Sequence, residues 1–68
     1  MKVGDLVKSV YPYHDDAMAI ISRVESAYDE IESRQRTVYS IVYTSGPFAG
    51  CEMIYFESDF HVHHRAVA

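Results

Sequence analysis

The sequence predicts a small all-β domain built as a closed or nearly closed barrel of five short strands. Three observations predict it: several short runs alternate apolar with polar residues, polar turn segments separate these runs, and the chain has only 68 residues. An open five-stranded sheet of this size would leave edges that pair with other molecules, whereas closure removes them. The composition is globular, with 49% hydrophobic and 13% aromatic residues.

The first strand is expected within "KVGDLVKSV", where a turn or bulge at Gly4 and Asp5 would let Val3, Leu6 and Val7 all reach the core. The other four strands are expected at residues 17–24, 37–43, 51–56 and 60–63. The run "TVYSIVY" is rich in β-branched and aromatic residues, which fit the half-buried surface of a sheet.

The segments between the strands carry turn residues. The loop "TSGPFAG", residues 44–50, has two glycines and a proline and predicts a hairpin connection, and "YPYHDD", residues 11–16, predicts an exposed loop. The segment 25–36 is ambiguous. Val24, Tyr28 and Ile31 have the spacing of a helix face, but a long polar loop or an extended hairpin is the alternative.

The stretch "YFESDF" places Glu57, Ser58 and Asp59 between the fourth strand and the last one. Serine and aspartate side chains bond nearby backbone N–H groups, so Ser58 and Asp59 are expected to stabilise one helical or 3₁₀ turn at this corner. Phe60 is expected to begin the last strand and to lie in the core.

One domain is expected over residues 1–68, with a core at about 2–63 and a short C-terminal tail at 64–68. The single cysteine, Cys51, suits a reducing cytoplasm and is expected to be a buried structural thiol. No N-terminal signal peptide and no run long enough to span a membrane are evident, so the expected location is cytoplasmic. The net charge of −4 and the scattered cations make nucleic acid an unlikely partner.

Four segments in order, "VGDLVK", "AIISRVE", "TVYSIVYTSG" and "IYFESDFHV", resemble those of small SH3-like barrel proteins. Such chains are frequent among uncharacterised proteins of tailed phages, including cyanobacterial phages. The resemblance covers roughly residues 2–63 and implies a five-stranded SH3-like barrel with room for one short helical turn. It also implies a phage accessory protein acting in the host cytoplasm. It implies no catalytic residues.

No catalytic constellation or cofactor-binding motif is evident, so an enzyme is not expected. His61 and His63 would share one face of a strand and are weak candidates for a metal site, because zinc needs three or four ligands and no third is nearby in sequence. A metal-binding protein using these histidines is therefore one alternative function. A nucleic-acid-associated barrel is another.

The tyrosines favour a different function. They are too many for so small a core, because each buried phenol oxygen needs a hydrogen-bond partner or water. Tyr11, Tyr13 and Phe48 are candidates for an aromatic patch that contacts a protein partner or a second copy of the chain, as in barrels that bind peptides. The competing interpretation is ordinary core filling. The sequence thus predicts a non-catalytic protein-interaction module that could self-associate.

Overall fold

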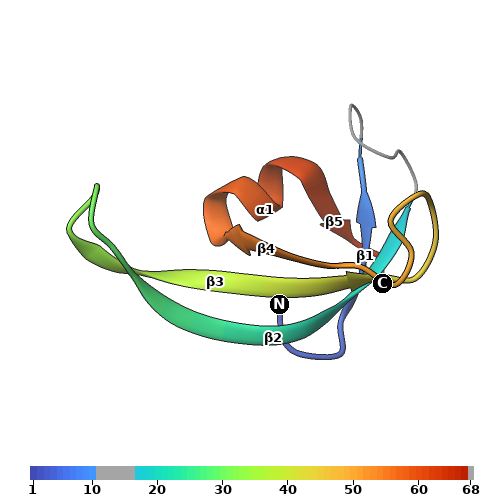
Figure 1. Ribbon diagram of the computed structural model, residues 1–68, viewed down its shortest axis with the longest axis horizontal. Coiled ribbons are helices and arrows are strands. Elements are labelled where there is room, and N and C mark those ends of the chain that lie inside the picture. The colour runs from blue at the N-terminus through green and yellow to red at the C-terminus, as the bar shows by residue number, and fades with distance from the viewer. Residues whose placement is uncertain (11–16, 68) are drawn as a thin grey trace.

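The computed structural model describes residues 1–10 and 17–67 of the chain. Its elements are β1 (Leu6–Ser9), β2 (Met18–Asp29), β3 (Arg34–Tyr43), β4 (Glu52–Phe56), α1 (Glu57–His63) and β5 (His64–Ala66). The five strands form one antiparallel sheet in the order β4-β3-β2-β1-β5, and α1 lies over one face of this strongly curved sheet (Figure 1). The predicted fold class, an all-β five-stranded barrel with one short helical turn, is confirmed.

The two ends of the sheet are β4 and β5, and α1 connects them. Within residues 1–10 and 17–67, no strand ladder joins β4 directly to β5. The barrel is therefore open between these two strands. We call this opening the seam.

The core lies on the inner face of the sheet, beneath α1. Alternate residues of β3 point inward, which buries Tyr39, Ile41 and Tyr43, and α1 adds Phe60, which is fully buried. The remaining members of the core cluster are Val7, Ala17, Ala19 and Ile21. Phe60 is thus a core residue, as expected, although it reaches the core from a helix.

Strands β2 and β3 form a long hairpin that projects from the body of the molecule (Figure 1). In its turn, the Asp29 carboxylate accepts hydrogen bonds from the N–H groups of Ile31 and Glu32, at 2.9 and 3.2 Å. Of the alternatives for 25–36, the extended hairpin is therefore correct. The helix-spaced residues have no core to cover, since Val24, Tyr28 and Ile31 are all exposed and Ile31 is 95% exposed.

The end of the chain differs from the prediction. Residues 60–63 belong to α1 rather than to a strand, and residues 64–66, expected in the tail, form β5 against β1. The helix also has no side-chain cap. Ser58 accepts instead from the Arg36 guanidinium at 2.6 Å, and Glu57 accepts from the Tyr39 hydroxyl at 3.1 Å. The predicted corner exists, but bonds to β3 hold it.

Three expectations of burial are wrong. Val3 and Leu6 are exposed while Val7 is buried, because the turn at residues 3–4 directs Val3 to solvent and Leu6 lies on the outer face of the sheet. Cys51 is also exposed, since it lies in the connection before β4 rather than inside a strand. Among the residues described, no helix is both long and apolar enough to cross a membrane.

Candidate functional site: a pocket at the seam

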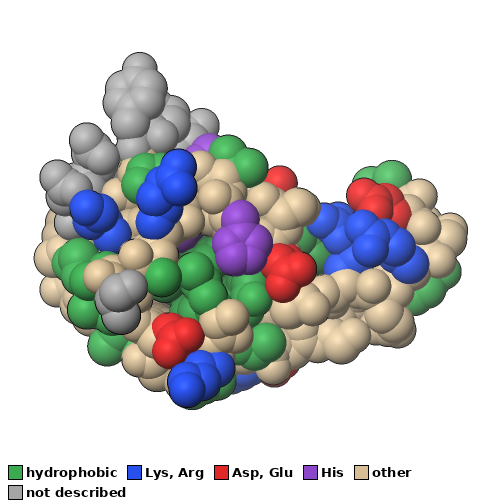
Figure 2. Space-filling view, turned by 180° about the vertical axis from the view of Figure 1, so that it is seen from behind, with side chains coloured by type: hydrophobic (Ala, Val, Ile, Leu, Met, Phe, Trp, Pro, Cys, Tyr) green, Lys and Arg blue, Asp and Glu red, His purple; other side chains and the backbone are tan. Residues whose placement is uncertain are grey.

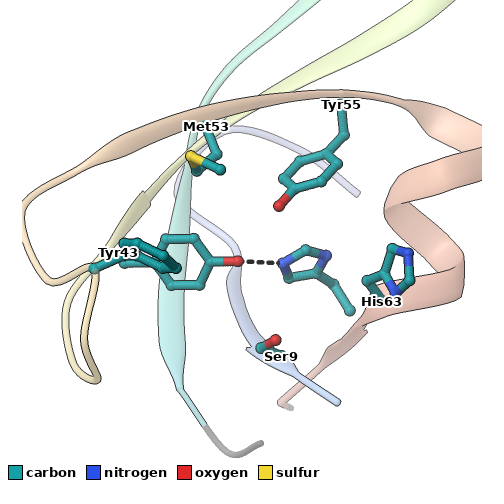
Figure 3. A pocket seen from close by; sticks show the side chains of 7 residues that line it. Ser9, Tyr43, Met53, Tyr55 and His63 are labelled. Carbon is teal, nitrogen blue, oxygen red and sulfur yellow. Dashed lines mark hydrogen bonds between the residues drawn. The ribbon is translucent and has the colours of Figure 1, made fainter. Parts of the chain in front are cut away.

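A pocket of about 340 Å³ opens at the seam of the barrel (Figure 3). It draws residues from β1, the end of β3, the β3–β4 loop, β4, the end of α1 and the start of β5. The lining residues are Ser9, Tyr43, Phe48, Met53, Tyr55, His63 and His64. Most of this lining is apolar or aromatic, with a few polar groups among it, which is the usual make-up of a ligand site.

The floor of the pocket is a hydrogen-bonded pair from opposite ends of the sheet. The Tyr43 hydroxyl lies 2.8 Å from Nε2 of His64, and Nδ1 of His64 lies 3.3 Å from the carbonyl oxygen of Phe60 (Figure 3). A carbonyl can only accept, so Nδ1 of His64 carries the proton. In the neutral ring Nε2 then accepts from the Tyr43 hydroxyl. Both ring nitrogens are therefore engaged.

Aromatic rings enclose this histidine. The His64 ring stacks on Phe60 with a centroid separation of 4.8 Å and an interplanar angle of 5°, and Tyr55 meets it edge-on at 5.0 Å. His64 is only 2% exposed. Burial lowers the pKa of His64, and the nearby His63 lowers it further, against the opposing effect of the hydrogen bond to Phe60. The imidazole is neutral at physiological pH.

Tyr43 is neutral as well. Burial raises the pKa of Tyr43 to about 12, and the neighbouring Tyr55 adds to the effect. The floor therefore offers uncharged hydrogen-bonding groups whose partners lie within the protein. This arrangement suits the recognition of an apolar surface better than the transfer of protons to a substrate.

The rim of the pocket is held by the β3–β4 loop. The Ser45 hydroxyl accepts from the N–H of Met18 at 2.9 Å, and Gly46, at φ +81°, approaches Ala17 so closely that an added Cβ would lie 2.9 Å from the Cβ of Ala17. These contacts fix the loop against the start of β2. Phe48, 40% exposed, then packs on Tyr43 with ring centroids 6.4 Å apart.

A second polar cluster lies on the hairpin, away from the pocket. Arg36 donates to Asp29 at 2.7 Å and to Ser58 at 2.6 Å, and its guanidinium lies 4.3 Å from the centre of the Phe56 ring. The bond from Arg36 lowers the pKa of Asp29. Basic and acidic side chains gather at this projecting end (Figure 2). The cluster joins the hairpin to α1, which gives it a structural role.

The structure places only part of the predicted aromatic patch. Phe48 lines the pocket, whereas Tyr11 and Tyr13 lie outside the described residues. Sequence reasoning missed Tyr43 and His64. The surplus of tyrosines was the available signal for the first, but His64 was assigned to the tail, and only the pairing of β5 with β1 brings it inside.

His61 and His63 do not share a face. In a helix, residues two apart point in nearly opposite directions, because each residue turns the chain by about 100°. His61 is exposed beside Tyr39 and Phe60, while His63 lines the pocket. Over residues 1–10 and 17–67, no three histidine, cysteine, aspartate or glutamate side chains lie close enough together to hold a metal ion.

Comparisons of the chain with protein-family models, with curated proteins and with solved structures found no match. The fold and the pocket are therefore the basis for assigning a function.

Proposed function

We propose that this chain is a non-catalytic binding module that recognises an extended segment of a protein partner at the seam pocket. The observation that carries the proposal is the position of the pocket between β4 and β5, the two edge strands of the sheet. Its volume of about 340 Å³ is close to the lower end of the range of ligand sites, roughly 300–1,000 Å³. A space of this size accepts one large side chain.

The edge strand β4 accounts for the extended form of the ligand. Its only ladder in the described part of the chain is the one with β3, so the backbone on its other side can pair with an added strand. Met53 and Tyr55 on β4 both line the pocket. Since alternate residues of a strand point to the same side, a segment added along β4 would direct every second side chain toward the pocket.

The lining accounts for the chemistry of the anchor residue. Phe48, Met53 and Tyr55 supply apolar and aromatic surface, and the Tyr43–His64 floor is neutral. A charged side chain would lose its hydration without meeting an opposite charge from these groups. An apolar or aromatic side chain is the favoured anchor.

Two further predictions stay predictions. The resemblance to phage accessory proteins and the cytoplasmic location rest on the sequence alone.

Nucleic acid remains an unlikely partner, and the hairpin supports this view. Arg23, Arg34 and Arg36 pair with acidic residues of the same hairpin, which neutralises these cations locally. An electrophoretic shift assay at low salt checks it.

A displayed library of random peptides, panned on the purified protein, tests the proposed function. We expect enriched sequences to share one apolar or aromatic residue flanked by strand-forming residues. Affinity for Phe48→Ala should fall about tenfold or more, since the rim residue is lost while the core is intact. Ile31→Ala, at the hairpin tip, is the matched control and should bind like the wild type. Enrichment without a shared anchor, or equal binding by Phe48→Ala, contradicts the proposal.

A further inference from the structure

The polar groups of the seam pocket can accept more hydrogen bonds than they can donate. Tyr43 and His64 form the floor, and Tyr55 lines the wall beside them with its hydroxyl directed toward that pair (Figure 3). A hydroxyl or an uncharged imidazole brings one donor and at least one acceptor atom. Whether a bound side chain should donate or accept therefore depends on where each donor of the pocket is used.

The single N–H of the His64 ring is used outside the pocket. Its Nδ1 donates to the carbonyl oxygen of Phe60, 3.3 Å away, so Nε2 carries no proton and accepts from the Tyr43 hydroxyl at 2.8 Å. The proton of Tyr43 is thereby committed to the imidazole. Tyr55 still has a proton to donate, whereas the phenol oxygens of Tyr43 and Tyr55 can both accept. One acceptor is left over.

The other polar residues of the lining do not change this excess. Ser9 and His63 both already interact with groups of the protein. The hydroxyl of Ser9 and an uncharged His63 ring each bring a donor and an acceptor together. A side chain that fills the pocket displaces water from the remaining acceptor. It must then donate a hydrogen bond itself or leave a buried oxygen unsatisfied, which weakens binding.

From this excess we infer that the anchor of the bound segment is a tyrosine, whose ring packs on Phe48 and Met53 and whose hydroxyl donates to a phenol oxygen of the pocket. The inference rests on the proposed function and narrows its ligand. A phenylalanine would fill the same space without a donor, and a lysine would bring a charge that no acidic residue of the lining offsets. Tyrosine carries its donor at the far end of the ring, where the floor lies.

A matched set of peptides tests the inference. One peptide enriched by panning is synthesised with tyrosine, phenylalanine or 4-methoxyphenylalanine as the anchor, and calorimetry measures the affinity of each for the full chain. The methoxy side chain keeps the oxygen but cannot donate. We expect the tyrosine peptide to bind about tenfold more tightly than the other two. Equal affinity of the tyrosine and phenylalanine peptides overturns the inference, as does enrichment of anchors other than tyrosine.

The dependence on Phe48 separates this failure from failure of the proposed function. If the preference for tyrosine is absent but Phe48→Ala still weakens binding about tenfold, the seam pocket is the binding site and only the identity of the anchor is wrong. If Phe48→Ala binds like the wild type, the site is wrong and the inference falls with it.

His64→Phe tests the source of the preference. The new ring can still stack on Phe60, but Nε2 is gone, so the Tyr43 hydroxyl can donate to a ligand. The preference for tyrosine over 4-methoxyphenylalanine should then fall to about threefold or less. His61→Phe makes the same replacement at an exposed histidine outside the pocket and should keep the preference. An undiminished preference in a folded His64→Phe contradicts the role of His64.

The protonation of the His64 ring can be observed without any substitution. Long-range ¹H–¹⁵N spectra of the wild type distinguish a protonated ring nitrogen from an unprotonated one. We expect the proton on Nδ1 and none on Nε2, both in the free protein and with the tyrosine peptide bound. A proton on Nε2 would make the Tyr43 hydroxyl a donor to the ligand and would overturn the inference.

Discussion

The Tyr43 hydroxyl lies 2.8 Å from Nε2 of His64, and this buried bond joins the end of β3 to the start of β5. No strand ladder in the described part of the chain closes the barrel between β4 and β5. Side chains hold the two sides of the seam together in place of backbone pairing. The same side chains form the floor of the pocket, so stability and binding depend on one set of groups.

Tyr43→Phe should destabilise the protein by roughly 1–3 kcal/mol. The substitution removes the hydroxyl and leaves Nε2 of His64 buried without its donor, while the ring and its packing remain. Urea unfolding followed by circular dichroism measures the effect. Tyr28→Phe is the matched control, since Tyr28 is 56% exposed and should change nothing. Equal stability of Tyr43→Phe and the wild type would show that the bond contributes nothing.

His64 should make the protein less stable in mild acid. Burial lowers the pKa of His64 below its ordinary value of 6.5, so the unfolded chain binds a proton more readily than the folded one. The contribution is fully present above pH 6.5, and it is lost as the pH falls from there toward the lowered pKa of the folded state. Urea midpoints at a series of pH values measure it.

His64→Gln is the control for this pH dependence, because it removes the titrating group. The variant should lose the part of the pH dependence between neutral and mildly acid pH that belongs to His64. If the wild type and His64→Gln lose stability in parallel as the pH falls, other groups cause the dependence.

Arg36→Lys should destabilise the protein even though it keeps the positive charge. Arg36→Lys retains a cation, but a lysine cannot donate to Asp29 and Ser58 with the fixed fork of a guanidinium or stack on Phe56 in the same way. We expect a clearly lower urea midpoint and faster hydrogen exchange at the base of α1. Arg34→Lys, in the exposed pair with Glu32, is the matched control and should have little effect. An unchanged midpoint for Arg36→Lys would mean that the cluster does not hold the hairpin to the helix.

Phe60→Ala should cost about 3 kcal/mol or more, because a fully buried ring leaves a cavity among Tyr39, Tyr55 and His64. Val62→Ala in the same helix is the control, since Val62 is 65% exposed. Thermal or urea unfolding compares the two. A Phe60→Ala variant as stable as Val62→Ala would place the ring outside the core.

The sequence predicted the sheet because strand formation leaves a local pattern. Tyr39, Ile41 and Tyr43 alternate with less buried residues, and the loop at 44–50 carries turn residues. It predicted a helical turn at residues 57–59, but not that the helix continues to His63 or that the last strand lies at His64–Ala66. Phe60 and Val62 alternate as in a strand, but they lie in α1, and α1 buries only Phe60. The strand register that carries His64 into the pocket depends on contacts distant in sequence.

The site was less predictable than the fold for the same reason. Phe48 could be proposed from its loop, whereas the Tyr43–His64 bond joins residues 21 positions apart. Ser58 is an example of a local expectation that was wrong. Its residue type suggested a local cap, but the Arg36 guanidinium, from a strand far along the chain, became its partner. Local rules failed where a charged group from another element competed for the same side chain.

The proposed function is tested most directly by mapping a selected peptide onto the protein. A ¹H–¹⁵N chemical-shift titration of the full chain with one peptide from the library follows every backbone amide at once. We expect the shifts to centre on the residues that surround the seam, above all Phe48, Met53, Tyr55 and His64, and Phe48→Ala should need about tenfold more peptide to reach the same shifts. Shifts that centre instead on the outer face of the sheet, at Leu6 and Ile20, would contradict binding at the seam pocket.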